Sequence, residues 1–174
     1  SDDVGFAMSS AFGGPVPTPN LERLAAQGQR YNRFHTTGIC SPSRAALLTG
    51  RNHHNTAMGM LADLPSDFPG YNAHIPASTA TIAEVLRLNG YNTAMFGKHH
   101  NVPPGEAGPM GPYDHWPTGL GFEYFYGFVS GDTDQWNPDL VRGTNEVPPL
   151  PVGSPPEVVD SRLAGDAIHW LHTK

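Results

Sequence analysis

The chain carries its only cysteine in the stretch Cys40-Ser41-Pro42-Ser43-Arg44-Ala45-Ala46-Leu47-Leu48-Thr49-Gly50-Arg51. Pro42 suits the first turn of a helix and Gly50 suits the residue that ends one, so we predict a helix from Pro42 to Thr49. Cys40 would then lie just before the helix N-terminus, where backbone N–H groups and the helix dipole favour negative charge. Arg44 lies one turn further along the same face. This arrangement suits a nucleophile that faces a bound anion, but the spacing alone also fits a buried structural cysteine.

The flanking sequence mixes predicted helices with predicted strands. Residues 18–28 form one predicted helix, with Thr18 as its cap and Gly28 as its end. Periodicity predicts two more helices over 81–89 and over about 160–174, and strands over 30–36 and 91–96. The last helix would carry one apolar face made of Leu163, Ala164, Ala167, Ile168 and Leu171. A helix followed by a strand is typical of the α/β class.

Residues 101–157 have a different composition, because they hold most of the 18 prolines and many glycines. Such a stretch cannot form one regular element. We predict long ordered loops there, anchored by the aromatic residues Trp116, Phe122, Tyr124, Phe125, Tyr126, Phe128 and Trp136.

Composition excludes several classes of partner. The net charge is −6, and Lys98 and Lys174 are the only lysines, so nucleic acid is not an expected partner. No apolar run reaches membrane-spanning length, so we expect no membrane segment. One cysteine permits either a cytoplasmic or a periplasmic location. The chain opens at Ser1 without a methionine, and we expect that the true N-terminus is missing.

Two further motifs carry groups that can do chemistry. Asp2 and Asp3 are adjacent acids, which form either a solvated turn or a pair of hard oxygen ligands for a cation such as calcium. Lys98 and His100 follow the predicted strand 91–96, and ligands commonly bind at the carboxyl ends of strands. Because they are two residues apart, both side chains would point the same way if the backbone stays extended. A lysine can hold an anion and a histidine can transfer a proton.

Taken together, these motifs resemble those of the formylglycine-dependent sulfatases of the arylsulfatase type. Residues 40–51 match the sulfatase signature at every defining position, residues 2–5 resemble its Asp-Asp-x-Gly motif, and Gly97, Lys98 and His100 match its Gly-Lys-x-His motif. Residues 18–25, 122–128 and 134–138 also look like parts of the family. The family has an alkaline-phosphatase-like α/β sandwich, with a central, mostly parallel sheet flanked by helices and many loops.

The resemblance implies a specific activity, the hydrolysis of a small-molecule sulfate ester. Cys40 would be converted to formylglycine by a formylglycine-generating enzyme and would act as the nucleophile. Asp2, Asp3 and the modified Cys40 would bind a divalent metal, most simply Ca²⁺. The remaining catalytic residues would be Arg44, Lys98 and His100, of which Lys98 and His100 would also bind substrate.

The resemblance also implies that residues 1–174 are the N-terminal part of a sulfatase catalytic domain. The first strand of the family, of which only Ser1 would remain, and the C-terminal portion are expected to be absent. Family members complete the metal site and the sulfate contacts further along the chain, so we expect this chain alone to be inactive.

Several alternatives stay open. Relatives with the same fold, metal and formylglycine hydrolyse phosphonate or phosphate monoesters, and a truncated chain could be a non-catalytic remnant. His99 stands where relatives often have an aromatic residue, and we predict that it forms part of the pocket wall, with metal binding as the alternative. His53 and His54 are structural residues or part of the same pocket.

Overall fold

The computed structural model describes residues 2–174, and Ser1, the residue assigned to the first strand, lies outside the described residues. The chain divides into two compact units, Ser1–Gly38 and Ile39–Lys174. The cysteine motif and the Lys98 motif both belong to the second unit, whereas Asp2 and Asp3 belong to the first.

The first unit contains the 3-10 helix η1 (Ser10–Phe12) and helix α1 (Pro19–Gln27), which confirms the predicted helix over 18–28 within a residue. Thr18 precedes α1 but makes no capping hydrogen bond with its side chain. Its hydroxyl instead lies 2.6 Å from Ser9 Oγ and 3.1 Å from Ser10 Oγ. The predicted cap was therefore wrong, because these hydroxyls are competing partners. The strand predicted over 30–36 is also absent from the described residues.

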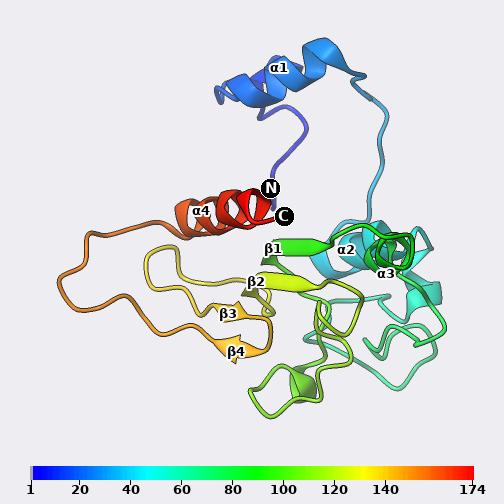
Figure 1. Cartoon of the computed structure of the whole chain (residues 1–174). Coiled ribbons are helices and arrows are strands. Elements are labelled where there is room, and N and C mark those ends of the chain that lie inside the picture. The colour runs from blue at the N-terminus through cyan, green and yellow to red at the C-terminus, as the bar shows by residue number, and fades with distance from the viewer. Residues whose placement is uncertain (1) are drawn as a thin grey trace. The chain divides into compact units, whose positions relative to one another are not determined.

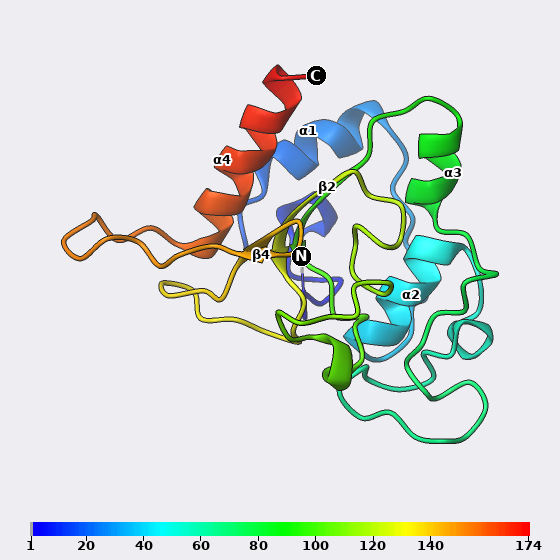
Figure 2. The same ribbon diagram turned by 60° about the horizontal axis from the view of Figure 1, so that its bottom comes forward.

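The second unit begins with α2 (Cys40–Thr49), followed by the 3-10 helix η2 (His53–Thr56) and by α3 (Ile82–Leu88). The predicted cap of α3 is confirmed, since Thr81 Oγ1 accepts a hydrogen bond from Glu84 N. The two α-helices lie side by side (Figure 1, Figure 2). A core cluster consists of buried residues from α2 and the loops after it, namely Ala45, Met58, Ala62, Ala73, Ile75 and Leu120.

One sheet forms the centre of this unit, with the strand order β1 (Ala94–Lys98), β2 (Tyr124–Phe128), β3 (Val141–Arg142) and β4 (Asn145–Glu146). The long β1–β2 pairing is parallel and the two short pairings are antiparallel. The sequence missed β2, which lies inside the segment predicted as loops. Loops and the 3-10 helix η3 (Pro104–Glu106) fill the rest of the segment before β2.

The predicted strand 91–96 is correct in kind but begins and ends too early, because β1 runs from Ala94 to Lys98. Its partner sets these limits, since Lys98 pairs with the last residue of β2. Before β1, the side chain of Thr93 donates to Gly121 O at 2.9 Å, and its backbone N donates to Glu123 Oε2 at 3.0 Å. These side-chain contacts fasten the entry to the strand.

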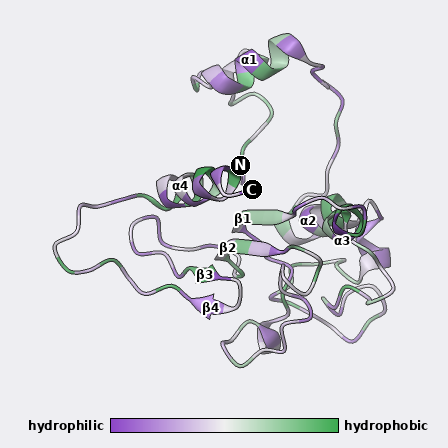
Figure 3. Ribbon diagram, viewed as in Figure 1, coloured by the Kyte–Doolittle hydropathy of each residue, from purple (hydrophilic) through white to green (hydrophobic). Residues whose placement is uncertain are grey.

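Helix α4 (Val159–His172) confirms the predicted last helix and packs against β1 and β2. Val159 is buried with Tyr126 and Leu140, and Leu163 packs against this cluster. Asp166 of α4 accepts hydrogen bonds from Tyr124 and Arg142, each at 2.6 Å. The predicted apolar face is only partly buried, because Ile168 and Leu171 are exposed. The ribbon of α4 carries both hydrophobic and hydrophilic residues (Figure 3). Among the described residues, no helix is both long enough and apolar enough to cross a bilayer.

Candidate active site

Cys40 is the first residue of α2 and not the residue before it, so Pro42 occupies the third helical position. The structure corrects the predicted boundary because the capping residue is Ile39, which is extended. Two distant segments hold this end of the helix. Ala62 N donates to Ser41 Oγ at 3.1 Å, and Asn101 Nδ2 donates to Ser41 O at 2.9 Å. The half-buried thiol therefore sits on a fixed helix N-terminus.

Arg44 connects α2 with the end of β1. Its Nη1 donates a hydrogen bond to the backbone oxygen of Lys98 at 2.6 Å. Both side chains are half-buried. The side chain of Arg44 thus reaches the carboxyl end of a half-buried parallel strand, where Lys98 lies.

His100 faces the cysteine. Its Nδ1 lies 3.0 Å from Cys40 Sγ, and its Nε2 lies 2.6 Å from Asp63 Oδ2. The backbone does not stay extended as the prediction for Lys98 and His100 assumed, because His100 has a left-handed φ of 53°. This turn, more than strand alternation, gives the ring its direction. The structure thus joins Cys40 with His100 and Arg44 with the backbone of Lys98, and Asp63 joins the first pair as a residue that the sequence reasoning missed.

Asp63 gave no signal in the sequence, because it is distant from both Cys40 and His100 and belongs to no motif that we recognised. Asn101 directly follows His100 and no role was predicted for it, but its contact with Ser41 supplies one. His54 lies beside Tyr71, with Nε2 3.0 Å from the phenol oxygen, and its ring contacts His53. These contacts favour the structural role of the two roles considered for His53 and His54.

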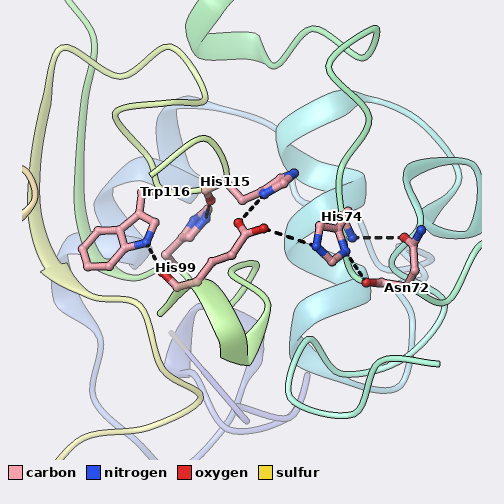
Figure 4. Close-up of polar contacts among 6 residues, drawn as sticks. Asn72, His74, His99, His115 and Trp116 are labelled. Atoms are coloured by element: carbon pink, nitrogen blue, oxygen red, sulfur yellow. Dashed lines mark hydrogen bonds and ion pairs between the residues drawn. The ribbon is translucent and has the colours of Figure 1, made fainter. Parts of the chain in front are cut away.

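His99 is fully buried between the site and a second group of polar side chains. Its Nε2 donates to His115 O at 3.0 Å, and His115 Nδ1 in turn donates to Glu106 Oε2 at 2.5 Å. On the other side of Glu106, His74 Nε2 lies 3.2 Å from Glu106 Oε1 (Figure 4). Burial of the ring, together with the positive charge of Arg44, lowers the pKa of His99 to about 4. A neutral His99 supports the backbone behind the site.

This buried histidine predicts a dependence of stability on pH. The unfolded chain takes up the proton near pH 6.5 and the folded chain only near pH 4, so the free energy of unfolding should fall as the pH drops through this window. Between pH 7 and pH 5 the loss from His99 should be about 2 kcal/mol. Urea unfolding of His99→Gln, which keeps a donor but does not titrate, should show a correspondingly shallower dependence on pH. The exposed His172 offers a control in His172→Gln, and an identical pH dependence for His99→Gln and the wild type would contradict this reading.

The proposed metal ligands belong to separate units, Asp2 and Asp3 to the first and Cys40 to the second. Asp2 and Asp3 are exposed, and Asp3 has a left-handed φ of 52°. Within residues 2–174, the structure contains no group of three or more His, Cys, Asp or Glu side chains arranged to hold a metal. Two carboxylates suit calcium in chemical kind but are fewer than the ligands it takes. The two carboxylates thus match a hard divalent cation in chemical kind, but the described residues do not by themselves form a site for one.

Comparison with known proteins agrees with these motifs. The arylsulfatase of Klebsiella aerogenes is 34% identical over 149 residues, which cover 84% of this chain and 30% of that protein. Human arylsulfatase A is 40% identical over 126 residues, which cover 71% of this chain and 24% of that protein. The chain thus spans about a third or less of the length of these relatives.

The fold has a solved counterpart. The crystal structure of Ps i-CgsB matches 99% of this chain and 40% of that chain, with a TM-score of 0.72 at 24% identity. This likeness confirms the expected alkaline-phosphatase-like α/β fold with flanking helices. The family model for sulfatases matches residues 1–174. The chain therefore belongs to the sulfatase family.

Proposed function

We propose that the protein containing this chain hydrolyses sulfate monoesters with a formylglycine made from Cys40. The observation that carries the proposal is the arrangement around Cys40. The residue begins a helix, Arg44 lies one turn along it, and the His100 ring is 3.0 Å from the thiol. A helix N-terminus, together with the positive charges of Arg44 and Lys98, favours an anionic substrate at the position of the nucleophile.

Each residue has a separate task in this proposal. Once a formylglycine-generating enzyme has converted Cys40, the hydrated aldehyde supplies one hydroxyl to attack sulfur and a second that lets sulfate be expelled. Arg44 and Lys98 hold the negative charge that grows on the sulfate oxygens. His100 Nδ1 faces residue 40, so it is placed to take a proton from a hydroxyl there.

Asp2 and Asp3, together with the modified Cys40, are the proposed metal ligands, and Ca²⁺ is the ion that best matches hard carboxylate oxygens. When bound, a divalent cation would lower the pKa of a hydroxyl and offset charge on the sulfate. The relatives are much longer than this chain. We therefore propose that the remaining ligands lie in the rest of the catalytic domain and that residues 1–174 alone do not turn over substrate.

The test compares matched substrates on the full-length protein, matured with a formylglycine-generating enzyme. An aryl sulfate should be hydrolysed faster than the phosphate and phosphonate esters of the same phenol. Exhaustive chelation should remove this activity and Ca²⁺ should restore it. A preference for phosphonate or phosphate would move the protein to that branch of the superfamily, and a matured protein that hydrolyses none of the three would be a non-catalytic remnant.

A further inference from the structure

We propose that Asp63 is a positioning residue that fixes the orientation and tautomer of His100 toward residue 40. This inference rests on the proposed function, because it concerns how the same site works. It follows from three features of the structure: the two contacts of the His100 ring, the anchoring of the Asp63 segment and the close packing of Gly131.

The His100 ring has a defined partner on each nitrogen. Its side chain is 4% exposed, with Nε2 2.6 Å from Asp63 Oδ2 and Nδ1 3.0 Å from Cys40 Sγ. A carboxylate oxygen only accepts hydrogen bonds, so the proton of a neutral ring belongs on Nε2. Nδ1 then presents its lone pair to residue 40. Without Asp63, the proton could move to Nδ1, and the ring could no longer accept one from the nucleophile.

The backbone around Asp63 is held by the helix that carries the cysteine. Ala62 is fully buried, and its N–H donates to Ser41 Oγ at 3.1 Å. A turn closes the same segment, since Leu64 N donates to Leu61 O at 3.0 Å. The carboxyl group itself is half exposed. Asp63 is therefore placed by the N-terminus of α2, and this gives Cys40 and His100 a common support.

Gly131 packs against the pair from the loop after β2. A Cβ atom at this position would lie 2.9 Å from His100 Cε1 and Nε2 and 3.4 Å from Asp63 Oδ2. The ring is held by hydrogen bonds on both nitrogens, so it cannot move aside without loss of one of them. A glycine at position 131 thus leaves room for the ring in the orientation that reaches both Cys40 and Asp63.

The experiment uses full-length protein with its formylglycine content measured by mass spectrometry. Asp63→Ala and Asp63→Asn should lower kcat by about 10–100-fold, the usual cost of losing an outer partner of a functional histidine, with little change in KM. Asp63→Glu should recover part of the loss, because a half-exposed carboxylate can adjust its reach. Asp67→Asn is the matched control, since Asp67 is an exposed aspartate of the same loop and should behave as the wild type.

Two readouts separate positioning from a general structural effect. In protein with ¹⁵N-labelled histidine, His100 should show a proton on Nε2 in the wild type and a changed tautomer in Asp63→Ala. Gly131→Ala should lower kcat through displacement of the ring, whereas Gly105→Ala, which has open space, should not.

The outcomes also separate this inference from the proposed function. Wild-type protein that carries formylglycine but hydrolyses no sulfate ester would overturn the function itself. Active wild type with a kcat for Asp63→Ala equal to that of Asp67→Asn would overturn the role of Asp63 alone. The same conclusion follows from a loss that Asp63→Glu does not recover and that leaves the tautomer of His100 unchanged.

Discussion

Cys40→Ala is expected to abolish sulfate ester hydrolysis in the full-length protein. Alanine has no thiol that can be oxidised, so neither the attacking hydroxyl nor the second hydroxyl that releases sulfate can form. The change should leave the fold intact, because the side chain is small and the start of α2 is held through Ser41. Turnover of an aryl sulfate, measured beside the melting temperature, checks both statements.

Cys40→Ser separates the modification from simple nucleophilic attack. A serine offers an alcohol of similar size, but a sulfate ester on it has no second hydroxyl to expel the sulfate. We expect nearly complete loss of turnover unless the host has a maturation system that accepts serine. In the wild type, the tryptic peptide of residues 34–44 should be lighter than its cysteine form and should react with a hydrazide. An active enzyme whose peptide is entirely unmodified cysteine would refute the mechanism.

Lys98→Ala is expected to have the next largest effect, a fall in kcat of about 10²–10³, which is typical when one donor to a developing negative charge is lost. The substitution keeps the backbone oxygen that accepts from Arg44, so the link between α2 and β1 should survive. The expected loss is therefore that of the ammonium group. If Lys98 holds the sulfate and not the leaving group, esters of acidic and of basic phenols should be slowed alike.

The measurement is kcat and kcat/KM across aryl sulfates of graded phenol pKa. Lys174→Ala is the natural control, because Lys174 is the other lysine of the chain and is exposed beyond the end of α4. A nearly unchanged kcat for Lys98→Ala would remove the proposed sulfate contact. A loss of kcat/KM in Lys98→Ala that grows with the pKa of the phenol would instead assign Lys98 to the leaving oxygen.

The elements that the sequence predicted well are those with local signals. Gly50 ends α2 through its left-handed backbone and Thr81 caps α3 through its side-chain oxygen, whereas α2 begins two residues before the start that Pro42 suggested. Strand β2 has no such signal. It lies between proline-rich loops, and its central residues are buried, so its side chains do not alternate between apolar and polar. Its existence depends on pairing with β1, which begins 30 residues earlier in the chain.

The candidate site likewise combines residues that carry a local sequence signal with residues that do not. Cys40 with Arg44, and Lys98 with His100, are close in sequence, so spacing could group each pair. Asp63 joins them only through folding, and its neighbours along the chain gave no reason to select it. The conformation of His100 was also beyond reach, because a positive φ at a residue other than glycine is set by the contacts around it.

The left-handed turn at His100 has a consequence for attempts to make the enzyme more resistant to heat. A backbone of this kind costs a residue with a Cβ atom about 1–2 kcal/mol, which glycine would recover. A choice of substitutions made on backbone conformation alone would therefore favour glycine at position 100. The same replacement would delete the ring that touches both Cys40 and Asp63. It would also leave a cavity where the buried ring packs, so the backbone gain would not make the protein more stable, and a programme of thermal engineering should leave this position unchanged.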